Sequence, residues 1–156
     1  LSVDQESGDG DAESARLEVA EILKQETGSD LRLTALVLLA MLDCDHGQLK
    51  SAEENARDAI RQYEKRCGGR TQTAALASQT LGRILIEAGR PAEATRCLEE
   101  ALQKRESVPG GDRCPYTARI LETLALAATA QGQSGQAATF EEHAAAIRSQ
   151  VDAAAR

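Results

Sequence analysis

The chain has 156 residues, of which 42% are hydrophobic and 28% charged, a balance typical of a single globular domain with a hydrophobic core. Only 2% of its residues are aromatic, so alanine and aliphatic side chains must fill the core, which favours closely packed helices over a β-sandwich. The net charge is −7 and much of it lies in the first 13 residues, which argues against the basic surface that a nucleic-acid-binding protein needs.

In chain order, the sequence predicts an acidic disordered tail, residues 1–11, followed by seven helices. Apolar residues recur at spacings of three and four, which marks amphipathic helices, and glycine-containing turns separate them. The predicted helices cover residues 12–26, 31–45, 48–66, 71–88, 91–108, 115–131 and 134–153. The predicted fold class is therefore all-α.

These helices follow an internal repeat. Gly47, Gly89 and Gly132 are 42 and 43 residues apart, and alanine stands five and twelve positions after each. A small residue stands seven positions before each glycine, directly after a leucine. The matching residues are Ala52, Ala94 and Ala137; Ala59, Ala101 and Ala144; Ala40, Gly82 and Ala125; and Leu39, Leu81 and Leu124. Each unit is thus two helices joined by a turn, and Gly82 predicts the closest crossing between them.

A half copy precedes the first full unit. Gly10 is followed by Ala15 and Ile22 at the two alanine positions, so this part supplies a second helix without its first. Its apolar stripe consists of Ala15, Val19, Ile22 and Leu23. This helix either caps the array or marks the boundary of a longer one.

The repeated residues resemble the tetratricopeptide repeat, which has leucine and a small residue in its first helix, glycine at the turn, and two small residues seven apart in its second helix. The 42-residue period is similar to that of kinesin light chains, as is the segment ALQKRESVPGGDRCP, residues 101–115. The resemblance implies a right-handed superhelical array of antiparallel helix pairs, a TPR-like solenoid in one domain, residues 12–156. Its parts are a half repeat (residues 12–30) and three repeats (residues 31–70, 71–113 and 114–153).

The resemblance also implies that the first helices line a concave groove, which would bind a peptide or segment of a partner protein. The candidate groove residues are Val37, Met41, Gln79, Arg83, Arg119, Glu122 and Leu126. Apolar contacts would supply most of the affinity, and Arg83 and Arg119 would favour an acidic partner. Alternatively, the two arginines only solvate the groove or pair with Glu87 and Glu122. The paired asparagines with which kinesin light chains hold a peptide backbone are absent.

A second interpretation is a scaffold subunit that packs through its convex face or terminal helices into a larger complex or a longer array. No catalytic motif is present, and the four cysteines lack the spacing of a metal site, so we predict free thiols, no cofactor, no metal and no enzymatic activity. The longest apolar run, residues 33–42, is too short to span a membrane. No signal peptide is predicted, so we expect an intracellular, cytoplasmic location. The chain does not begin with Met, and a targeting segment could have been removed.

Overall fold

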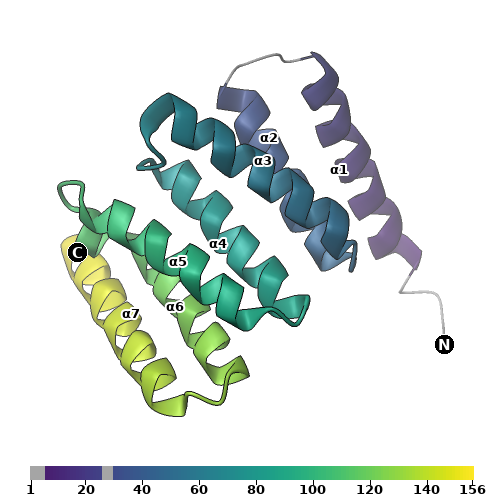
Figure 1. Cartoon of the computed structure of the whole chain (residues 1–156). Helices are drawn as coiled ribbons and strands as arrows, with labels where there is room; N and C mark the ends of the chain where they lie inside the picture. Colours follow the sequence, from purple (N-terminus) through teal and green to yellow (C-terminus); the bar gives the residue numbers. More distant parts are fainter. Residues whose placement is uncertain (1–5, 26–29) are drawn as a thin grey trace.

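The computed structural model describes residues 6–25 and 30–156, which form seven α-helices and one short 3₁₀ helix (Figure 1). The helices are α1 (Glu6–Gln25), α2 (Asp30–Asp45), α3 (Leu49–Cys67), α4 (Gln72–Glu87), α5 (Pro91–Glu106), α6 (Pro115–Ala130) and α7 (Ser134–Ala154), and the 3₁₀ helix η1 is Gly111–Arg113. No strand occurs in these two ranges. The predicted all-α class is therefore confirmed.

The helix boundaries match the predicted ones within two residues except at the start of α1. This helix begins at Glu6, so residues 6–11, which the sequence places in a disordered tail, are helical. Residues 1–5 of that predicted tail lie outside the described residues. Once the segment from residue 12 is helical, each further residue adds one hydrogen bond for one pair of fixed dihedral angles, so extension costs little. Gly10, which aligns with the turn glycines of the repeats, consequently lies inside a helix.

The three aligned glycines end the first helix of each pair in the same way. Gly47, Gly89 and Gly132 have φ values of 74°, 77° and 74°, a left-handed conformation that glycine adopts without strain. The residue after each glycine donates its backbone N–H to a carbonyl five residues earlier, for example Gln48 to Asp43 at 2.8 Å. This is the Schellman arrangement that closes helix C-termini, and it explains why the glycine recurs once per unit.

The loops between pairs are closed by other residues. Gly68 caps α3 in the left-handed conformation, and Thr71 begins α4 by accepting a hydrogen bond from the backbone N–H of Ala74 at 3.2 Å. The buried Arg105 donates from Nη1 to the carbonyl of Arg70 at 2.7 Å, which fastens this loop to α5. A Cβ at Gly111 would overlap the carbonyl oxygen of Arg105, so only glycine fits at the start of η1.

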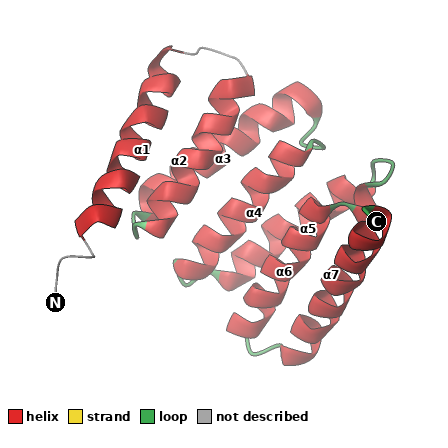
Figure 2. Ribbon diagram, turned by 180° about the vertical axis from the view of Figure 1, so that it is seen from behind, coloured by secondary structure: helices red, strands yellow, loops and turns green. Residues whose placement is uncertain are grey.

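The helices form two layers. In the described part of the chain α4 packs against both α2 and α6, whereas the backbones of α3, α5 and α7 do not approach one another closely. The first helices of the pairs therefore form the inner, concave layer and the second helices the outer one. Figure 2 shows the molecule from the side of α2, α4 and α6. α1 packs only on α2, on the side where α3 packs on α4 in the next unit, so it occupies the place of a second helix.

The core is built from alanine and aliphatic residues. The main cluster contains buried residues of α2 to α7, and a smaller cluster lies between α2, α3 and α4. The close crossing predicted at Gly82 is present: a Cβ there would lie 2.8 Å from side-chain atoms of Leu98, which is completely buried. Ala40 and Ala125 are also buried at the equivalent crossings.

Candidate partner-binding face

The seven residues predicted to line the groove all lie on α2, α4 and α6, but the structure divides them into interior and surface positions. Val37 is buried in the core cluster of α2, α3 and α4, and Gln79 is buried as well. The side chain of Gln79 donates from Nε2 to Oγ1 of Thr123 on α6 at 3.0 Å. Both residues therefore join neighbouring first helices in this structure instead of facing an open groove.

Val37, Gln79 and Glu122 occupy the same position in the three units, and their burial follows from the array. Val37 is covered because α4 follows α2, and Gln79 because α6 follows α4. In the described part of the chain no first helix follows α6, and Glu122 stays half-buried. It forms an ion pair with Arg148 of α7, with Nε and Nη2 at 2.6 and 2.9 Å from its two carboxylate oxygens. This bidentate contact lowers the pKa of Glu122.

Arg83 belongs to a polar cluster at one edge of this layer. Its Nη2 lies 3.4 Å from Oδ1 of Asp45, an exposed residue of α2. Next to this pair, the thiol of Cys44 donates to Oε2 of Glu87 at 3.4 Å. Burial, followed by the bond to Glu87, raises the pKa of the Cys44 thiol to about 11, so it is protonated at neutral pH. Arg83 pairs with Asp45 and not with Glu87, the partner suggested by the sequence.

Arg119 and Leu126 are the most open of the predicted residues. They are seven residues apart on α6 and therefore share one face of the helix. Leu126 is 57% exposed, and Arg119 is exposed and makes no side-chain hydrogen bond or ion pair with the described residues. Met41, on α2, is half-buried. We call Met41, Arg83, Arg119 and Leu126 the inner-layer surface.

Sequence reasoning missed a buried carboxylate. Asp43 is completely buried, and its two oxygens accept hydrogen bonds from Arg16 Nε and Ser51 Oγ, each at 2.7 Å, and from Asn55 Nδ2 at 3.3 Å. These partners lie on α1 and α3, so Asp43 joins three helices. The sequence held one signal. Asp43 aligns with Leu85 and Ala128, which are buried, and a charged residue at a buried position needs partners.

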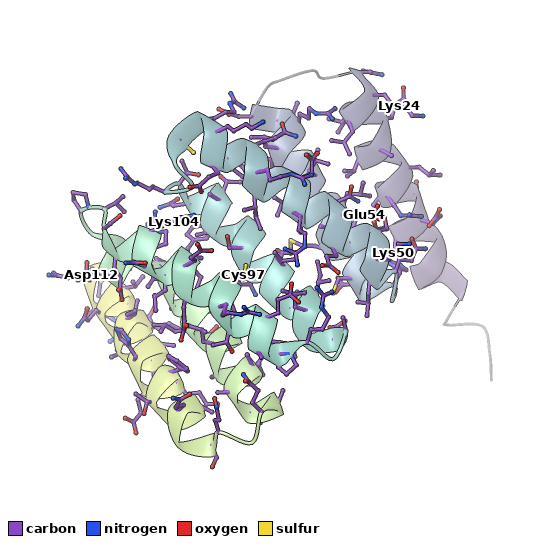
Figure 3. The ribbon with its side chains drawn as sticks, in the orientation of Figure 1. Lys24, Lys50, Glu54, Cys97, Lys104 and Asp112 are labelled. Atoms are coloured by element: carbon purple, nitrogen blue, oxygen red, sulfur yellow. The ribbon has the colours of Figure 1, made fainter. Side chains whose placement is uncertain are left out.

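Sequence reasoning also missed a groove on the outer layer, between α3 and α5. Its volume is about 780 Å³, and its floor includes Ile60, Leu81 and Cys97. Figure 3 marks Cys97 on α5, with Lys104 two turns further along the same helix. Burial raises the pKa of the Cys97 thiol to about 11, so this sulfur is a poor nucleophile at neutral pH.

Ion pairs connect α3 to α5 at both ends of this outer groove. At one end, Arg57 and Arg90 each contact both Glu53 and Glu93 at distances between 2.7 and 2.9 Å. At the other end, Lys104 Nζ lies 2.8 Å from Glu64 Oε2. We call the first group of four residues the α3–α5 clamp.

Within the described ranges, no group of three or more His, Cys, Asp or Glu residues could hold a metal ion, and no helix is long and apolar enough to cross a membrane.

Comparison with protein families gives a match to the tetratricopeptide repeat over residues 72–150, half of the chain. The chain belongs to the tetratricopeptide repeat family. Members of this family are protein-interaction or scaffold modules and are typically non-catalytic. The match covers α4, α5, α6 and most of α7, including the crossing at Gly82. No curated protein matches the chain.

Solved structures share its fold at low sequence identity. BtubC (BKLC) from P. vanneervenii is 22% identical, with a TM-score of 0.79 over 92% of this chain and 59% of that one. Two structures of a putative kinesin light chain from Podosopora anserina with nearly identical TPR-like repeats, one of them a point variant, are each 22% identical, over 90% of this chain and 66% of those. Their TM-scores are 0.72 for the point variant and 0.69 for the other. The tetratricopeptide repeat chain described here thus spans about three fifths to two thirds of the length of these relatives, and the likeness shows the TPR-like solenoid.

Proposed function

We propose that the inner-layer surface binds a segment of a partner protein that carries acidic and apolar side chains. The observation that carries this proposal is the pairing of Arg119 and Leu126 on one face of α6, because the cation has no ion-pair partner in the described chain and the leucine is mostly in water. Together they offer a partner both apolar area and a positive charge that a carboxylate can bind.

Arg83 extends this surface onto α4. Its contact with Asp45 is long and both side chains are partly exposed, so a partner carboxylate can replace Asp45 at small cost. Arg83 and Arg119 each add roughly 0.2–1 kcal/mol in such exposed contacts, so burial of Leu126 and Met41 must supply most of the affinity.

The scaffold alternative remains the second candidate function. The exposure of further apolar side chains on α1 and α2 favours it.

The proposal is tested by charge reversal. After affinity capture from the native source and identification of the partner by mass spectrometry, binding of the purified partner is measured by calorimetry. The double variant Arg83→Glu/Arg119→Glu should weaken binding roughly tenfold or more, because two attractions become repulsions. The control is Arg96→Glu, which reverses an exposed arginine on the outer layer. If the double variant folds normally and binds with full affinity, the inner-layer surface is rejected in favour of the convex face or the ends.

A further inference from the structure

A buried hydrogen bond joins two neighbouring first helices, α4 and α6, which lie side by side (Figure 2). Gln79 of α4 donates from Nε2 to Oγ1 of Thr123 on α6 at 3.0 Å. The same hydroxyl donates to the backbone carbonyl of Arg119 at 2.9 Å. Gln79 and Thr123 are 9% and 2% exposed, so little water competes for these bonds. Because a hydrogen bond tolerates only a narrow range of distances and angles, this contact holds α6 in one position beside α4.

The aligned residues of the preceding pair, α2 and α4, make no bond of this kind. In the repeat alignment, Val37 and Thr80 stand where Gln79 and Thr123 stand in the next pair. Valine has no polar side-chain atom, and the hydroxyl of Thr80 donates to the carbonyl of Leu76 in its own helix at 2.8 Å. Polar contacts between α2 and α4 lie at the edge of the layer and are 3.4 Å long. The interior polar bond is therefore specific to the α4–α6 junction.

This bond lies between the two arginines of the inner-layer surface. Gln79 precedes Arg83 by one helical turn, and Thr123 follows Arg119 by one turn. In the repeat alignment Arg83 corresponds to Leu126, seven residues after Arg119, so the two cations are offset by about 10 Å along the helix axes. Packed helix axes lie about 8–10 Å apart, which gives roughly 14 Å between the two Cα positions. The contact of Gln79 with Thr123 keeps this separation constant.

We propose that Gln79 and Thr123 are positioning residues through which the inner-layer surface selects a partner by the spacing of its carboxylates. The inference rests on the proposed function, since it needs a segment that meets Arg83 and Arg119 together. It deepens that function by stating which acidic segment fits.

The separation of the arginines favours an extended segment. A helix covers 14 Å in about nine residues, and residues nine apart lie on opposite faces, so only one carboxylate would face the surface. In an extended chain, residues two or four apart lie on the same side, and four residues span about 13 Å. Two carboxylates four residues apart therefore meet both arginines, whereas two carboxylates two residues apart span about 7 Å and meet only one.

The positioning role is tested first without any ligand. Thr123→Val removes only the hydroxyl, and Gln79→Met/Thr123→Val removes both polar groups at nearly constant size, so the double variant should stay about as stable as wild type. Residual dipolar couplings of the backbone amides report the orientation of α4 relative to α6. These couplings should change in both variants and stay as in wild type in Thr123→Ser, which keeps the hydroxyl. The matched control is Thr80→Val, which removes the equivalent hydroxyl from a bond within α4 and should leave the couplings unchanged.

The selection is then measured by NMR titration with two short synthetic peptides of equal composition, each containing leucine and two glutamates. The glutamates are four residues apart in the first peptide and two apart in the second. Wild type, Thr123→Ser and Thr80→Val should bind the first peptide roughly two- to fivefold more tightly, because it gains one more arginine–carboxylate contact. Thr123→Val and the double variant should lose this preference. Arg119→Glu should lose it as well.

Three results would overturn the proposal. Unchanged dipolar couplings in the double variant would reject the positioning role, whatever the peptides do. Changed couplings with an unchanged preference for the first peptide would show that the bond shapes the array without selecting a partner. If neither peptide shifts the amide signals of α4 and α6 in the wild-type chain, the surface does not bind acidic segments, and the selection by spacing fails together with the proposed function.

Discussion

At the scale of single residues, packing in this chain depends on where a side chain is absent. Gly82 has no Cβ at the point where α4 and α5 cross, and Leu98 fills that space. Gly135, in the first turn of α7, has no atom within 4 Å of the place of its Cβ. The two glycines should therefore tolerate a larger side chain very differently, although both are helical.

The first prediction compares these two sites. Gly82→Leu should lower the free energy of unfolding by about 1–3 kcal/mol, because Leu98 is fully buried and cannot move into solvent. Gly135→Leu makes the same chemical change in open space and should be neutral or slightly stabilising, since leucine favours a helix more than glycine does. Urea unfolding of both variants measures the difference. Equal stability of the two variants would show that α4 and α5 do not cross at Gly82.

At the scale of helices, charged residues hold neighbouring second helices together. The α3–α5 clamp, together with the pair of Lys104 and Glu64, joins two helices whose backbones do not approach each other closely in the described chain. Hydrogen bonds from Arg90, with a further contribution from Arg57, lower the pKa of Glu53. A carboxyl group whose pKa is lowered by folding stabilises the protein above its unfolded pKa, and this stabilisation is lost as the pH falls through the lowered folded value.

The clamp predicts a pH-dependent effect of Glu53→Gln. At pH 7 this substitution should lower Tm modestly, because Arg57 loses a carboxylate partner within α3 and Arg90, at the start of α5, loses its partner on α3. The difference from wild type should stay constant down to about pH 4.5, the ordinary carboxyl value, and shrink below it. High salt should also reduce it. Thermal unfolding followed by circular dichroism measures these differences, with Glu99→Gln, an exposed residue of α5 without an ion pair among the described residues, as the control. A difference that grows on acidification would contradict the clamp.

How far the sequence predicts the structure also depends on scale. Spacing predicts the helices, the turn glycines and the crossing at Gly82, because each follows from local backbone geometry or from a repeated small residue. It does not predict that Val37 and Gln79 are interior, since their burial depends on how closely α2, α4 and α6 approach one another. The Asp43 cluster was missed for a similar reason, because Arg16 is 27 residues away and only the packing of α1 brings it near.

At the scale of the whole molecule, each helix depends on its immediate neighbours. α4 packs against α2, α3, α5 and α6, whereas α1 packs only against α2. No residue of α1 between positions 10 and 25 is buried, while nine residues of α4 are. In such arrays stability is nearly a sum of nearest-neighbour terms, so local stability should decrease from the centre towards α1.

The last prediction tests this gradient through Asp43. Native-state hydrogen exchange of the wild-type chain should be slowest in α4 and fastest in α1. Asp43→Ala removes the shared acceptor of Arg16, Ser51 and Asn55 and should cost about 1–3 kcal/mol, because three half-buried donors lose their partner. Since Arg16 is the contact from α1, exchange in α1 should accelerate most, while α4 keeps most of its protection. Asp45→Ala removes an exposed carboxylate two residues away and should leave α1 unchanged. Uniform acceleration across all helices in Asp43→Ala would instead mean that the array unfolds as one cooperative unit and that α1 has no separate stability.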